Sequence, residues 1–206
     1  KVKCVRKARA IFGAGEEIAS DDLKQYFQRE ALPELAFTPD AEYGVCNREK
    51  GILHVELSAP ADGSRLESLH GGTVRNAVAA SARAEARCTA EECEALEALS
   101  KKMDGKFSFQ WSGGVLTAEC AGRAAHAMEP QKGRNAAARL VRLFSSCFGG
   151  EALGALWSFV DQKIGLELDG SSLGLRREDA VSGPLTVNLG VAEQDNGVCR
   201  AVLDIR

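Results

Sequence analysis

Apolar and polar residues alternate with a period of two in several short stretches, which is typical of β-strands with one buried face. The clearest are Phe107–Trp111 and Val115–Ala121, and the Ser-Gly-Gly between them predicts a hairpin. Near the C-terminus, Asn196 and Gly197 favour a tight turn between two further strands. The same alternation predicts strands at residues 2–12, 52–58, 66–69, 82–88, 185–193 and 198–206.

Helices are predicted from their N-terminal signals. Thr89 and Glu92 form a capping-box pattern, so a helix should begin there and continue to about Met103. Ser20 and Asn135 stand where N-caps are expected. The predicted helices are residues 21–30, 90–103, 136–148 and 151–162. Residues 79–84 stay ambiguous, because their alanines favour a helix although a strand pattern follows directly.

The order of these elements predicts an α+β fold. From about residue 80 it reads strand, helix, strand, strand, helix, helix, strand, strand, which indicates an antiparallel sheet with helices on one face, close to the ferredoxin-like plan. The first quarter reads strand, helix, loop, strand, as in an α/β domain. We therefore predict two domains, residues 1–56 and residues 57–206.

Composition and charge argue against some classes of function. A net charge of −3 over 206 residues argues against nucleic-acid binding. No apolar run is long enough for a membrane span. Seven scattered cysteines without a Cys-x-x-Cys pair indicate reduced thiols in the cytoplasm. The chain starts at Lys1 and ends at Arg206 inside strand-like patterns, so we expect it to be an internal piece of a longer protein.

Three acidic residues are candidates for metal chemistry. Glu16 and Glu17 are adjacent after a glycine turn, so one can ligate a cation while the other accepts a proton from water. From spacing alone, the acidic start of a helix is the more common explanation of such a pair. Asp40 lies in a loop about one strand–helix–loop later, where an α/β sheet can return it to the same edge, although a turn aspartate after a proline is also common.

Three further residues are candidates for substrate contacts. His126 lies between a strand and a helix, at the rim of the predicted sheet, although a solvated loop histidine would look the same. Asn76, in a glycine-flanked loop, can offer its amide or simply form a turn. Arg206 can pair with a carboxylate or be an ordinary surface arginine. We interpret His54 and His70 as structural.

Five segments together resemble a known family. They are ARAIFGAGEEIASDDLKQYF, LAFTPDAEYGVCNREKGI, GGTVRNAV, GRAAHAMEPQKGRNAA and LDIR, and they span residues 8–206. In this order they resemble the di-zinc aminopeptidase and dipeptidase family that includes PepV-type bacterial dipeptidases, carnosinases and aminoacylases. The resemblance implies that residues 1–56 belong to a catalytic domain and residues 57–206 to a lid domain.

The resemblance also implies a role for each candidate. Glu16 would be the general base, and Glu17 and Asp40 would be ligands of two zinc ions. His126 would stabilise the oxyanion from the lid. Asn76 and Arg206 would hold a dipeptide or short peptide, with Arg206 on its terminal carboxylate. Whether the metal is zinc, cobalt or manganese is open, since carboxylate and imidazole suit several.

The chain also departs from the family pattern. The family needs an upstream His-x-Asp, a bridging Asp and a second His further on, and the chain contains no His-x-Asp. We therefore expect this chain alone to lack zinc and to be inactive, with a mobile His126 loop. The rival hypotheses are a lid module that self-associates through a sheet edge without chemistry of its own, and a ferredoxin-like module for small ligands or RNA.

Overall fold

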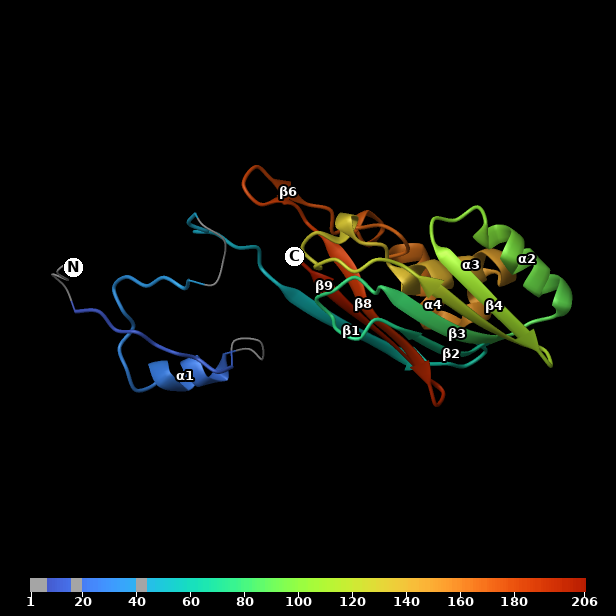
Figure 1. Cartoon of the computed structure of the whole chain (residues 1–206), viewed down its shortest axis with the longest axis horizontal. Coiled ribbons are helices and arrows are strands. Elements are labelled where there is room, and N and C mark those ends of the chain that lie inside the picture. The colour runs from blue at the N-terminus through green and yellow to red at the C-terminus, as the bar shows by residue number, and fades with distance from the viewer. Residues whose placement is uncertain (1–6, 16–19, 40–43) are drawn as a thin grey trace. The chain divides into compact units, whose positions relative to one another are not determined.

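The computed structural model describes residues 7–15, 20–39 and 44–206 (Figure 1). The chain divides into two compact units, Lys1–Cys46 and Asn47–Arg206. This division lies ten residues before the predicted domain boundary at residue 56. Strand β1 (Leu53–Pro60) therefore lies entirely in the second unit. Whether the catalytic and lid parts meet at residue 56 stays a prediction.

The second unit is built on an antiparallel sheet of seven strands, which confirms the predicted α+β class. Across the sheet the strands are β1, β9 (Val198–Ile205), β8 (Val187–Asp195), β2 (Leu66–Gly71), β3 (Ser81–Arg87), β5 (Val115–Ala121) and β4 (Lys106–Ser112). A separate small ribbon pairs β6 (Glu178–Asp179) with β7 (Gly183–Pro184). The ambiguous residues 79–84 lead into β3 and form no helix.

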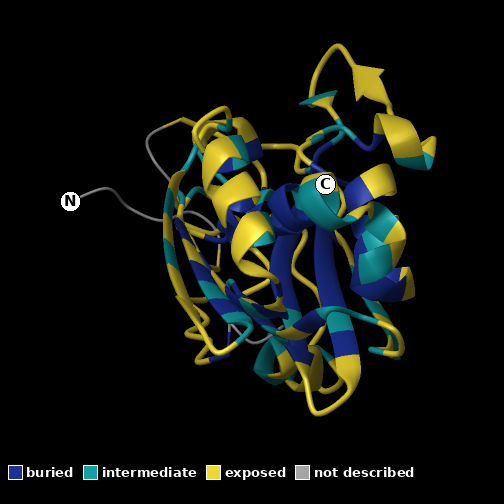
Figure 2. Ribbon diagram, turned by 90° about the vertical axis from the view of Figure 1, so that its right-hand side faces the viewer, coloured by how far each residue is buried: buried dark blue, intermediate teal, exposed yellow. Residues whose placement is uncertain are grey.

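Three α-helices of this unit cover one face of the sheet (Figures 1 and 2). They are α2 (Ala90–Ser100), α3 (Ala136–Phe148) and α4 (Gly154–Lys163). Single turns of 3₁₀ helix occur at η2 (Pro130–Lys132), η3 (Gly150–Leu153) and η4 (Ser171–Leu173). The capping box predicted for α2 is present, since Thr89 accepts from the Glu92 amide and Glu92 accepts from the Thr89 amide. Asn135 caps α3, whose bounds match the prediction.

The core lies between the sheet and the helices, where buried positions gather (Figure 2). Small residues let α3 lie close to the sheet: β3 contributes buried alanines, and a Cβ on Gly71 would come within 2.6 Å of the Ala137 Cβ. The largest wholly buried side chains are Trp157 and Phe144. Trp157 satisfies its indole N–H by donating to Gln194 Oε1 at 2.6 Å.

The order of strands follows the ferredoxin-like plan in one part of the sheet and departs from it in another. Helix α2 links β3 to β4, and β5 lies between these two strands, which is the split β–α–β arrangement. On the other side of β3, strand β2 takes the place next to it. The sheet therefore extends beyond a four-stranded plan.

The first unit holds little regular structure in its described residues. Helix α1 (Asp21–Phe27) forms as predicted but ends three residues early, and the Ser20 side chain makes no capping bond. The strand predicted at residues 2–12 is wrong for residues 7–12, which form no strand, and residues 2–6 lie outside the described part. The strand predicted at residues 52–58 is β1 of the large sheet. Alternation alone does not make a strand, because its backbone needs a hydrogen-bonded neighbour.

Candidate functional site at one end of the sheet

Two loops that are far apart in sequence pair with each other through their backbones. The Ala127 amide donates to the Asn76 carbonyl at 2.9 Å, and the Val78 amide donates to the Ala125 carbonyl at 2.9 Å. Between these bonds, Ala77 and His126 form an antiparallel bridge. Two of the predicted substrate residues, Asn76 and His126, are therefore brought together.

Thr186, which precedes β8, connects Arg206 to the same loops. The Thr186 amide donates to the Arg206 carbonyl at 2.7 Å, and the Arg206 amide donates to the Thr186 carbonyl at 3.0 Å. The Thr186 hydroxyl donates to the Ala127 carbonyl at 3.3 Å. The backbones of all three predicted substrate residues thus belong to one hydrogen-bonded cluster.

Asparagines and glycines let the loops lie against the sheet. Asn188 Nδ2 donates to the carbonyls of Ala77 at 2.9 Å and Arg75 at 3.3 Å. A Cβ on Gly190 would overlap the Arg75 carbonyl oxygen, so only glycine permits this approach. Asn135 donates to the Leu189 carbonyl at 2.7 Å besides capping α3. Sequence reasoning identified only the capping role of Asn135 and missed Asn188.

The His126 side chain is exposed, although its backbone is held at both ends of the bridge. We expect a mobile loop because its partners are missing, but the residue 72–80 loop supplies backbone partners from within the same unit. The mobility itself stays a prediction. His126 Nδ1 accepts from the Met128 amide at 3.2 Å. In the neutral ring this places the proton on Nε2, which can then donate to a negatively charged oxygen.

Asn76 is exposed and uses its backbone, not its side chain, to hold the loops together. Within the described ranges, its side-chain amide forms no hydrogen bond with protein. Both the donor and the acceptor of this amide are therefore available to a ligand.

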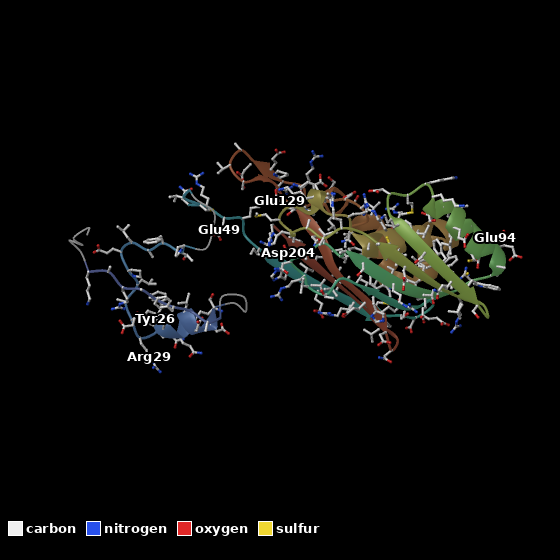
Figure 3. All side chains as sticks on the ribbon, in the orientation of Figure 1. Tyr26, Arg29, Glu49, Glu94, Glu129 and Asp204 are labelled. Carbon is white, nitrogen blue, oxygen red and sulfur yellow. The ribbon has the colours of Figure 1, made fainter. Side chains whose placement is uncertain are left out.

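Arg206 is fixed by a buried carboxylate that sequence reasoning missed. Its Nε donates to Asp204 Oδ1 at 2.8 Å and its Nη2 donates to Asp204 Oδ2 at 3.2 Å. Asp204 is wholly buried, and its Oδ2 also lies 3.1 Å from Nε2 of His54 on β1. Figure 3 labels Asp204 near the end of β9, and Glu129 of the His126 loop at the same end of the sheet. His54, interpreted as structural, thus has a defined partner.

The candidates for metal chemistry, Glu16, Glu17 and Asp40, lie outside the described residues. The glycine turn just before Glu16 is described. There the Asp22 carboxylate accepts from the amides of Ala14 at 2.6 Å and Gly15 at 3.2 Å, and the Ala14 bond is the main cause of its lowered pKa. Among the described residues, no cluster of histidine, cysteine and acidic side chains could hold a metal ion. The zinc ligand set therefore stays a prediction.

The described cysteines show no sign of redox or nucleophilic chemistry. No disulfide joins the described cysteines. Burial raises the pKa of the Cys88 and Cys120 thiols to about 11, which makes both poor nucleophiles near neutral pH. No helix in the described residues is long and apolar enough to cross a membrane.

Over most of its length, this chain is similar in sequence to proteins named as dipeptidases. "Putative dipeptidase YtjP" of Bacillus subtilis (strain 168) is 29% identical over 200 residues, which cover 93% of this chain and 43% of that protein. The Beta-Ala-Xaa dipeptidase of Lactobacillus delbrueckii subsp. lactis is 27% identical over 191 residues, or 87% of this chain and 40% of that protein. No protein-family model matches the chain. The predicted resemblance to dipeptidases is confirmed, and the chain spans less than half the length of these relatives.

Proposed function

We propose that this chain is the substrate-holding part of a zinc-dependent dipeptidase, which hydrolyses dipeptides or short peptides by metal-activated water. The observation that carries the proposal is the backbone pairing of the Asn76 and His126 loops, with Arg206 attached through Thr186. These residues, in a chain similar to named dipeptidases, supply the polar groups that a short peptide needs. We further propose a cytoplasmic location and no nucleic-acid or membrane partner.

Each residue has a distinct task in this proposal. The Arg206 guanidinium would pair with the terminal carboxylate of the peptide. Asn76 would orient the backbone of the substrate through its side-chain amide. The His126 Nε2–H would donate to the carbonyl oxygen as negative charge develops on it during water attack. Glu16 would accept the proton of the attacking water.

Two zinc ions would complete the site of the full enzyme, with Glu17 and Asp40 as ligands from this chain. When bound, zinc supplies a lowered water pKa and a polarised substrate carbonyl. Such a centre also needs imidazole ligands and a bridging carboxylate, and a partial ligand set binds the metal poorly. We therefore propose that residues 1–206 alone do not hydrolyse peptides.

Hydrolysis of dipeptides by the full-length gene product with added Zn²⁺ tests this function. The His126→Ala variant should lower kcat by about 10²–10³-fold, as is usual for loss of an oxyanion donor. His70→Ala is the matched control, because His70 is an exposed histidine on β2 outside the paired loops, and it should leave kcat unchanged. Equal rates for the two variants would contradict the proposal, as would no hydrolysis by the full-length product or turnover by residues 1–206 alone.

A non-catalytic role as an interaction module is the second candidate. Strands β1 and β4 are the two edges of the large sheet, and edge strands offer unpaired backbone groups to another chain. Trp111 at the β4 edge is 45% exposed, although its indole N–H donates to the Cys88 carbonyl at 3.1 Å. Sedimentation across a range of concentrations tests this role: self-association that is lost with a proline in β4 would support it.

A further inference from the structure

Asp204, the next-to-last residue of β9, is an unusual residue for a buried strand position. Its side chain is wholly buried, yet it carries a carboxylate, and a buried charge is costly unless it is paired. Two partners reach it from different places, Arg206 two residues later and His54 from the neighbouring strand β1. Among the described residues, Asp204, Arg206 and His54 therefore form a hydrogen-bonded cluster at the end of the sheet where the loops of Asn76 and His126 meet.

The cluster leaves Arg206 able to bind a second anion. Asp204 occupies Nε and Nη2, which form one edge of the guanidinium. Of the five N–H groups of an arginine, this leaves both hydrogens of Nη1 and one of Nη2. Within the described residues, Nη1 has no protein partner. Because the guanidinium is planar, these hydrogens form an end-on edge that can hold a carboxylate through two bonds.

We propose that Asp204 is a positioning residue, which fixes the Arg206 guanidinium so that its free edge recognises the terminal carboxylate of the substrate. This proposal rests on the proposed dipeptidase function. The restrained guanidinium loses less side-chain freedom on binding, so affinity for the carboxylate rises without any contact between Asp204 and the substrate. His54 completes the arrangement by holding Asp204 Oδ2 from β1.

The physical half of the proposal is tested on this chain without any activity assay. Exchange of the Arg206 Nε–H with water, followed by NMR, should be slow in the unmodified chain and about tenfold faster in Asp204→Asn, since that bond is weakened. Glu193→Gln is the matched control, because Glu193 pairs with Arg200 on β9 at 2.9 Å and leaves Arg206 untouched. Unchanged Arg206 exchange in Asp204→Asn would overturn the proposal.

The recognition half is tested by kinetics of the full-length gene product. For a dipeptide with a free carboxylate, Asp204→Asn should raise KM about tenfold with kcat within about twofold, since ground-state binding is what weakens. KM for the corresponding dipeptide amide should not change. A merely structural Asp204 would alter both substrates equally, and that result would overturn the proposal.

The tests of the proposal do not all depend on the folding of Asp204→Asn or on the dipeptidase activity. Where Asp204→Asn does not fold, His54→Ala replaces it, because His54 is exposed and its loss should not unfold the sheet. We expect about a threefold rise in KM for the free carboxylate alone, from a weakened hydrogen bond to Asp204. An unchanged preference for carboxylate over amide in that variant would overturn the proposal. If the full-length product hydrolyses no dipeptide, the proposed function and the recognition half fail together, while the NMR result still decides whether Asp204 fixes Arg206.

Discussion

The two compact units of this chain differ in what stabilises them. In residues 47–206, a sheet and three helices enclose large apolar side chains such as Trp157 and Phe144. In the described residues of the first unit, only Gly15 is buried, and Phe12 and Phe37 are at least 90% exposed. Local bonds hold the first unit instead, among them the Arg9 pair with Glu30 at 2.8 Å and the turn held by Asp22.

This difference indicates which part of the chain holds the candidate site rigid. The paired loops of Asn76 and His126 lie on the unit that has its own core, and they are tied to strands of that unit through Asn188 and Asn135. In the described residues, the glycine turn before Glu16 is held by the Asp22 carboxylate, whose bond to the Ala14 amide is exposed and whose bond to the Gly15 amide is part-buried. Exposed polar contacts contribute little stability, so we attribute the preorganisation of the substrate-holding residues to the packed core of the second unit.

The largest expected effect is the difference in unfolding free energy between two Phe→Ala variants, one in each unit. Phe144→Ala should lower the free energy of unfolding by about 3–5 kcal/mol, because it opens a cavity beside α3 and the sheet. Phe37→Ala should change it by less than about 0.5 kcal/mol, since that ring is 90% exposed. Urea unfolding of both variants measures the difference. Comparable losses would show that the first unit has a core and would break the comparison.

A glycine pair sharpens the comparison at the site. Gly190→Ala should destabilise the second unit by about 1–3 kcal/mol, because its methyl group would push the Arg75 carbonyl off the sheet. Gly51→Ala is the control, since nothing lies within 4 Å of a Cβ there, and its effect should be small. Hydrogen exchange should also become faster at the Ala127 amide in Gly190→Ala alone. Unaltered exchange would mean that the loop does not depend on this close approach.

Sequence reasoning succeeded where the structure is set by local chemistry. The capping residues Thr89 and Asn135 place the starts of α2 and α3, because a cap acts on amides two or three residues away. The strand predicted at residues 2–12 is wrong for residues 7–12, because alternation does not specify a pairing partner. Its counterpart at residues 52–58 formed β1 because β9 is there to pair with it.

The candidate site was predictable only in part, for the same reason. His126 and Asn76 could be proposed from motifs, but their backbone bridge depends on residues about fifty positions apart in sequence. Asp204 has no local signal, because an acidic residue in a strand usually faces solvent, as Glu193 does in β8. The burial of Asp204 depends on the assembled sheet, in which β1 pairs with β9 and places His54, 150 residues away in sequence, beside it.

The smallest effect concerns one ion pair in each unit. Glu92 accepts from Arg65 at 2.8 and 2.6 Å and from the Thr89 amide at 2.9 Å, and these bonds, the Arg65 bonds first, lower its pKa from the ordinary 4.5 to about 2. A carboxylate whose pKa is lower in the folded state stabilises the fold fully above about pH 4.5. That contribution is lost as the pH falls toward 2, where the carboxylate is protonated in the folded state as well.

Glu92→Gln should therefore lower the free energy of unfolding by about 1 kcal/mol at pH 7, a modest figure because the pair is partly exposed to solvent. The gap between this variant and the unmodified chain should narrow steadily between pH 4.5 and pH 2. Glu30→Gln in the first unit is the matched control, since the Arg9–Glu30 pair is nearly half exposed and should contribute almost nothing at either pH. Urea unfolding at pH 7 and at a pH between 4.5 and 2 measures the free energy of unfolding of both variants. A gap for Glu92→Gln that stays constant with pH would show that the stability of the second unit does not depend on this charge.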